Sequence, residues 1–193
     1  MFFRDLKMKP TTIDVTFVEA RLPVHMGHRD ASTVFGDPLN RQLAAAAMGT
    51  LTKVRAHEAG PDDICGVTLH LGLRDASRAS LETVASMLDF LHAPYGSSIR
   101  RADGGEPVVF GVAEGLEISV DSALAPDGAG RRDFAKMCSD AMKGLAVNRG
   151  WTRRADKTVF YFYGESVRSM QDRLSEAFDA HPILASARAR RLA

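Results

Sequence analysis

The chain has 193 residues, of which 45% are hydrophobic and 25% are charged, as in ordinary globular proteins. Its 25 basic and 24 acidic side chains give a net charge of +1, which argues against a dedicated nucleic-acid or membrane-surface binder. No apolar run reaches the ~20 residues that span a bilayer, and the N-terminal residues lack the pattern of a secretion signal. The only two cysteines, Cys65 and Cys138, lie in different halves, as expected for reduced thiols. We therefore expect a cytoplasmic protein without a membrane partner.

The first half predicts the order strand, helix, strand, strand, helix, strand. The residues around Val15–Val18 are β-branched and aromatic, which is typical of a strand. A histidine-containing loop follows from Arg21 to about Gly36. Asp37-Pro38 then predicts a helix start, because Asp caps free N–H groups and Pro at the first helical position loses no hydrogen bond. The remaining expected elements are strands at Thr50–His57, Cys65–Leu73 and Ser97–Arg101, and a helix through Leu81–Leu91 capped by Ser77 or Ser80.

The second half predicts the same six elements in the same order. Its apolar residues alternate in the strands and recur at helical spacing in the helices. The strands are expected at Leu116–Val120, Trp151–Arg154, Thr158–Tyr163 and Ala185–Leu192, and the helices at Asp133–Val147 and at Ser166–Ala180, where His181-Pro182 ends the second one.

This repeated order predicts an α+β protein, a tandem duplication of a ferredoxin-like β-α-β-β-α-β unit with antiparallel strands and both helices on one face. The first and third strands of such a unit are central, and here they are the apolar ones. The predicted edge strands carry arginine and lysine, which discourage pairing with other chains. We expect two domains, residues 10–103 and 106–193, packed closely because the link between them is short. The pattern leaves open whether the repeats share one sheet.

The loop before the first helix contains the clearest group of metal-ligand residue types. His25, His28 and Asp30 could supply part of a zinc or iron site. A complete site needs three or four ligands with supporting hydrogen bonds, and no further His or Cys is placed to help. We therefore predict no metal and no cofactor, with these three residues as the weak candidates. No phosphate-binding loop or serine-nucleophile motif is present, so the sequence indicates no catalytic residue.

An aromatic strand in the second half is the other notable feature. Alternation places Tyr161 and Tyr163 on one face of the strand. RNA-recognition modules stack bases on aromatic residues at this position of the fold, although their glycine-containing signature is missing here. Half-buried tyrosines that pack or contact a partner are the alternative. The candidate binding residues are Tyr161, Tyr163, His70 on the matching strand of the first half, and Arg153.

Short motifs distributed along most of the chain give it a resemblance to a known group of sequences. They are Phe35-Gly36-Asp37-Pro38-Leu39, Ala93-Pro94-Tyr95-Gly96-Ser97, Phe110-Gly111 with Glu114-Gly115-Leu116, and Tyr161-Phe162-Tyr163-Gly164. The chain resembles a family of uncharacterised bacterial proteins of similar length. This resemblance implies a bacterial, cytoplasmic origin and no particular activity or functional residue.

The absence of a catalytic set favours a non-enzymatic module that binds another protein, as an inhibitor or an immunity-type partner. The first alternative is a small-molecule sensor or a metal-dependent enzyme whose site lies between the halves, where a duplicated fold leaves a cleft. The second alternative is an RNA-binding protein that uses the open face of a sheet, although the charge balance argues against nucleic acid as a partner.

Overall fold

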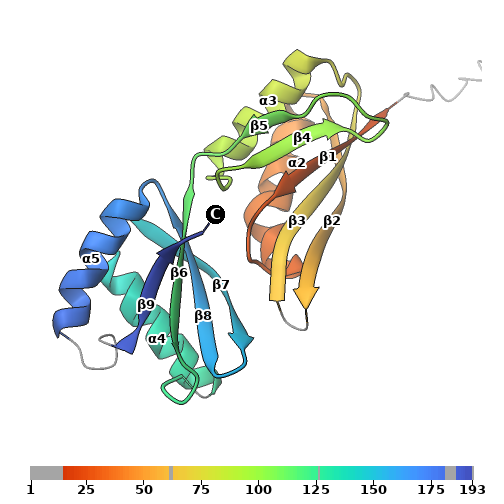
Figure 1. Cartoon of the computed structure of the whole chain (residues 1–193). Coiled ribbons are helices and arrows are strands. Elements are labelled where there is room, and N and C mark those ends of the chain that lie inside the picture. The colour runs from red at the N-terminus through yellow and green to blue at the C-terminus, as the bar shows by residue number, and fades with distance from the viewer. Residues whose placement is uncertain (1–14, 61–62, 126, 181–185, 193) are drawn as a thin grey trace, which may run out of the picture.

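The computed structural model describes residues 15–60, 63–125, 127–180 and 186–192 (Figure 1). The described part of the chain forms two β-sheets, each covered by helices on one side. The strands are β1 Thr16–Leu22, β2 Gly49–Gly60, β3 Asp63–Leu73, β4 Ser97–Arg101, β5 Val108–Phe110, β6 Glu114–Asp121, β7 Ala146–Arg154, β8 Lys157–Gly164 and β9 Arg188–Arg191. The helices are α1 His28–Ala31, the π-helical turn η1 Ser32–Gly36, α2 Asp37–Ala45, α3 Arg78–Phe90, α4 Gly128–Ala141 and α5 Val167–Ala180.

The strand order in both sheets is that of a ferredoxin-like unit. The first sheet has the order β2-β3-β1-β4-β5 and the second has the order β7-β8-β6-β9, with antiparallel pairing throughout. In each sheet the first and third strands of the repeat are central, as predicted. The duplicated α+β fold is therefore confirmed, and the two repeats form separate sheets.

The strand register shows that the two repeats correspond residue by residue. Glu19 of β1 lies opposite His70 and Arg100, and Glu117 of β6 lies opposite Tyr161 and Arg190. The second strand of each repeat also carries a β-bulge at the same place, between Leu51 and Lys53 in β2 and between Asn148 and Gly150 in β7. Equivalent positions in the two halves can therefore be compared directly.

Each sheet buries one face against its own helices. In the first repeat, α2 and α3 lie on one side of the sheet (Figure 1). Their buried leucines and valines belong to one apolar cluster with the inward residues of β1 and β3. In the second repeat, Phe134 of α4 lies 4.9 Å from the ring of Phe160 of β8, measured between ring centroids. No helix in the described residues combines the length and the apolar character needed to cross a membrane. Within the described ranges, the opposite face of each sheet carries no helix of its own. These two open faces differ in what covers them.

The first helical segment begins nine residues earlier than the sequence predicted. The expected loop up to Gly36 is helical from His28, because α1, η1 and α2 follow one another without a break. Pro38 has no N–H to donate to the carbonyl of Val34, and the wider π-helical turn falls on the residues just before it. Asp37-Pro38 therefore marks an irregularity inside a helix instead of a helix start.

Two other boundaries also differ from the prediction. Helix α4 begins at Gly128 instead of Asp133, because the carboxylate of Asp127 accepts a hydrogen bond of 2.7 Å from the N–H of Gly130 and caps the helix there. The predicted domain boundary before residue 106 is too early, since β5 pairs with β4 and extends the first sheet. The predicted break at His181-Pro182 and the start of the last strand at Ala185 lie outside the described residues.

Candidate functional site

The open face of the second sheet is covered by the first half of the chain. Tyr161 and Tyr163 are 1% and 4% exposed and belong to the same apolar cluster as the core of the first repeat. The Tyr163 hydroxyl accepts a hydrogen bond of 3.1 Å from the backbone N–H of His25 and donates one of 3.4 Å to the carbonyl of Pro23. Burial raises the pKa of both tyrosines, that of Tyr161 to about 12. The two halves are thus joined through this face.

His25 of the first half contacts the second sheet directly in this junction. Its ring stacks on Tyr161 with centroids 4.0 Å apart and planes 8° apart. Burial lowers the pKa of His25, and its Nδ1 atom is buried with no hydrogen-bond partner among the described residues. The backbone is equally close, because a Cβ on Gly150 would lie only 2.7 Å from the carbonyl oxygen of His25. Burial therefore favours the neutral form of the His25 ring, which is stacked on Tyr161 between the two halves.

A small charge network lies beside the stacked rings. The guanidinium of Arg154 is 3.3 Å from Asp63 of the first half and 3.5 Å from Glu117, and it donates a hydrogen bond of 3.1 Å to the Tyr161 hydroxyl. Glu117 is 6% exposed and also accepts two hydrogen bonds of 3.0 Å from Arg190. These bidentate and shared contacts fix the polar border of the junction.

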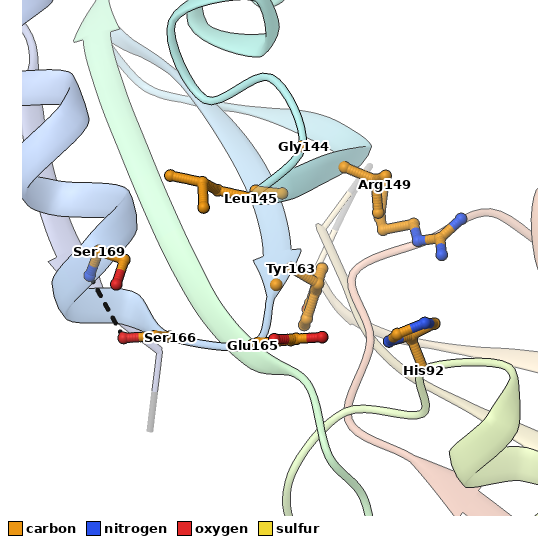
Figure 2. A pocket seen from close by; sticks show the side chains of 11 residues that line it. His92, Gly144, Leu145, Arg149, Tyr163, Glu165, Ser166 and Ser169 are labelled. Carbon is orange, nitrogen blue, oxygen red and sulfur yellow. Dashed lines mark hydrogen bonds between the residues drawn. The ribbon is translucent and has the colours of Figure 1, made fainter.

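A cavity of about 380 Å³ opens between the halves on another side of Tyr163. It is formed by the loop after α3, the start of β7 and the turn from β8 into α5. Figure 2 shows the side chains of Arg149 and His92 entering it from different halves of the chain, with Tyr163 and Glu165 beside them. Its polar lining residues are His92, Arg149, Tyr163, Glu165, Ser166 and Ser169.

Arg149 owes its position in this cavity to the bulge of β7. It is the extra residue between Asn148 and Gly150, and bulges re-aim side chains out of the regular alternation of a strand. The side-chain amide of Asn148 donates hydrogen bonds to the carbonyls of Gly150, at 3.3 Å, and Tyr161, at 3.2 Å, which supports the bulged backbone. The equivalent extra residue in the first repeat is Thr52, which donates to the carbonyl of His70.

The guanidinium of Arg149 is partly removed from water. Burial lowers its pKa, and its planar group lies 5.9 Å from the ring centroid of Phe35. No carboxylate in the described ranges of the chain lies within ion-pair distance of it. A partly desolvated cation of this kind is stabilised by an anion with planar or tetrahedral oxygens, which a guanidinium binds through two parallel hydrogen bonds.

The other polar residues of the cavity can hydrogen-bond a ligand. His92, which follows α3 in a left-handed conformation with φ of 58°, lines the cavity. The Ser166 hydroxyl, which also lines it, accepts a hydrogen bond of 3.3 Å from the N–H of Ser169. No hydrogen bond joins His92 to Ser166 or Glu165 in the structure as described. Arg149 is therefore the cation of a cavity whose other polar groups are hydroxyls, an imidazole and the carboxylate of Glu165.

The structure separates the residues that the sequence proposed as a metal site. His25 points into the junction, whereas His28 and Asp30 are exposed on α1. Within the described ranges, no group of three or more His, Cys, Asp or Glu side chains is arranged to hold a metal ion.

The four candidate binding residues also lie apart. Tyr161 and Tyr163 are buried between the halves, so they do not form the exposed stacking surface that the RNA hypothesis required. His70 lies on the open face of the first sheet, with its Nδ1 3.8 Å from Glu19. Arg153 is exposed and its neighbour Arg154 makes the contacts across the junction, because successive strand residues point to opposite faces.

Neither Arg149 nor His92 was predicted from the sequence. The predicted strand began at Trp151, so the bulge fell outside it. One signal was available, because a glycine such as Gly150 inside a strand often marks a bulge. No local pattern places His92 and Arg149 in one site, since they are far apart in the sequence and line the same cavity only through the packing of the halves.

Comparison with known proteins leaves the function open. No family model and no curated protein matches the chain. Among solved structures, a protein of unknown function from Galdieria sulphuraria is 12% identical with a TM-score of 0.32, covering 93% of this chain and 99% of that one. The first two RRM domains of yeast poly(U) binding protein are 9% identical with a TM-score of 0.28, covering 91% and 99%. An anthrone oxidase-like protein is 9% identical with a TM-score of 0.25, covering 92% and 90%. Scores this low support no argument about function.

Proposed function

We propose that this protein binds a small anionic molecule, bearing a carboxylate or phosphate group, in the cavity between its two halves. The observation that carries the proposal is the Arg149 guanidinium, which a β-bulge directs into a 380 Å³ cavity and which has no carboxylate partner among the described residues. A cavity of this size suits a small metabolite. His92 and Ser166 offer hydrogen bonds to its remaining polar groups.

Both halves of the chain contribute to the cavity, which supports a sensing role. His92 belongs to the first repeat and Arg149 to the second. A ligand that contacts both would stabilise the junction by binding the native state in preference to the unfolded chain. The protein-binding role that the sequence suggested stays a prediction beside this one.

The test is a thermal-unfolding and calorimetric titration with named anions. Inorganic phosphate, succinate and a nucleoside monophosphate are compared with the uncharged succinamide and nucleoside. We expect at least one anion to raise the melting temperature with saturation, and Arg149→Gln to abolish the shift. Arg168→Gln, an exposed arginine of α5, is the matched control and keeps it. Absence of saturable binding of these anions, or binding that Arg149→Gln leaves unchanged, overturns the proposal.

A further inference from the structure

The open face of the first sheet is a second surface with a defined chemistry, and it is independent of the cavity. Its residues follow from the register: those opposite Gly72, His70 and Thr68 of β3 point away from α2 and α3. Unlike the equivalent face of the second sheet, it is not covered by the other half in the described residues. The outward residues on this face are Phe17, Glu19, Arg21, Lys53, Arg55, His57, Thr68, His70, Ser98, Arg100 and Val109.

One aromatic ring stands on this face with little around it. Phe17 of β1 is 58% exposed, although a phenylalanine on a central strand is normally covered. The residue directly opposite on β3 is Gly72, which has no side chain to shield the ring. Val109 of β5 is also exposed, at 71%. Val109 lies in the register row of Arg21 and Ser98, away from Phe17, so the face offers one exposed aromatic ring and a separate apolar side chain on a rigid sheet.

Cationic side chains lie on the same face as Phe17. Glu19 is the acid at its centre, and its carboxylate is shared between Arg21 at 3.3 Å and Arg100 at 3.9 Å. Lys53 and Arg55 of β2 are exposed, and no ion pair holds either of them within the described ranges. The net charge of +1 of the whole chain thus conceals a positive local surface.

The same face is hollowed next to the cations. A shallow cavity of about 460 Å³ is lined by Arg21, His57, Thr68 and Ser98 among others. Thr68 is 3% exposed and its hydroxyl lies 2.7 Å from Nε2 of His57, so the floor of the hollow carries ordered hydrogen-bonding groups. Such a hollow can accept a flat polar ring beside a phosphate-binding rim.

We infer that this face binds single-stranded nucleic acid. An exposed aromatic ring stacks an unpaired base, and a surrounding rim of arginine and lysine binds the backbone phosphates. Double-stranded nucleic acid fits less well, because its bases are already stacked. An acidic peptide would use the cations and leave Phe17 without a specific role, which distinguishes the two partners.

The experiment is fluorescence anisotropy of the whole protein with labelled oligouridine and oligothymidine, titrated at low salt and with increasing salt. We expect saturable binding whose affinity falls steeply as salt rises. Phe17→Leu should weaken binding about tenfold, and Arg100→Gln should reduce the dependence on salt. The matched controls are Phe90→Leu on α3 and Arg41→Gln on α2, both exposed on the helical side, and they should bind as the parent does.

Three results would overturn the inference: no anisotropy change at low salt, a Phe17→Leu variant that binds as tightly as Phe90→Leu, or displacement by oligoglutamate as efficient as by unlabelled oligonucleotide. The last result would show an acidic-peptide surface instead. The relative affinities of oligouridine and oligothymidine distinguish RNA from DNA. Because Arg149→Gln leaves this face intact, failure of anion binding in the cavity and failure here can be told apart.

Discussion

The open faces of the two sheets have the same register but opposite surroundings. At one equivalent position the first repeat pairs an exposed Phe17 with Gly72, and the second pairs Gly115 with a buried Tyr163. The aromatic residue of this pair is on the first strand in the first repeat and on the third strand in the second repeat. In the second sheet it anchors the first half, whereas in the first sheet it remains exposed. A duplicated unit can thus use one face as an internal junction and keep its copy free for a partner.

The glutamates at the centre of the two open faces show the same difference between an exposed and a covered surface. Glu19 and Glu117 occupy equivalent positions, and each faces an arginine of the fourth strand, Arg100 or Arg190. The side chain of Glu117 is 8% exposed and bidentately bound, while that of Glu19 is 24% exposed with contacts of 3.3 to 3.9 Å. Burial converts a loose surface cluster into a fixed network.

The largest effect is expected from removing a ring of the junction. Tyr161→Ala should lower the free energy of unfolding by about 3–5 kcal/mol, because it leaves a large cavity against His25. Urea denaturation measures the change. Tyr95→Ala is the matched control, since Tyr95 is 72% exposed and its loss should cost within about 0.5 kcal/mol. Equal losses of unfolding free energy in the two variants would show that the open face of the second sheet is not tightly packed against the first half.

The equivalent glutamates should also differ in what they contribute to the free energy of unfolding, with a smaller difference than that between Tyr161 and Tyr95. Glu117→Gln should destabilise by about 1–2 kcal/mol, because two arginines lose a charged acceptor in a mostly buried place. Glu19→Gln should cost about 0.5 kcal/mol or less, since its ion pairs are exposed. Chemical denaturation of both variants at one pH decides this. A larger loss of unfolding free energy for Glu19→Gln than for Glu117→Gln would contradict the conclusion that the open face of the second sheet is covered and that of the first sheet is exposed.

The junction should also weaken in mild acid. Burial lowers the pKa of His25 from its ordinary value of 6.5, while Asp63 and Glu117 oppose this shift and Arg154 adds to it. The unfolded chain therefore binds the proton more readily, so stability present above pH 6.5 is lost as the pH falls below it. Melting temperatures of the parent and His25→Phe, measured across this range, should diverge below that pH. His28→Phe, at an exposed histidine, is the control and should behave as the parent.

The smallest effect, of opposite sign, is expected at the cavity. Arg149→Met should leave stability unchanged or raise it by up to about 1 kcal/mol, because it removes a partly desolvated cation without a counter-ion among the described residues. Denaturation without added anion measures this. A loss of more than about 1 kcal/mol in the free energy of unfolding would mean that Arg149 stabilises the fold instead of serving as a ligand-binding residue.

Local patterns in the sequence determined the secondary structure and the duplication. Alternating apolar residues predicted β3, a continuous apolar and aromatic run predicted β8, and helical spacing predicted α3 and α5. The predicted cap of α3 was Ser77 or Ser80, and the structure shows Ser77. Such signals depend on neighbours in the chain, so they can be read directly. The start of α1 was missed because Asp37-Pro38 resembles a helix start, and only the η1 turn shows how a helix accommodates that proline.

The packing between the repeats was decided by tertiary structure alone. Alternation placed Tyr161 and Tyr163 on one face, but it cannot say whether that face meets water or another part of the chain. Likewise, no local sequence pattern shows that Arg149 at the bulge of β7 would line the same cavity as His92. These outcomes depend on contacts between distant residues, which have no local signature. The sequence by itself therefore determined two similar units, and their mutual packing made them different.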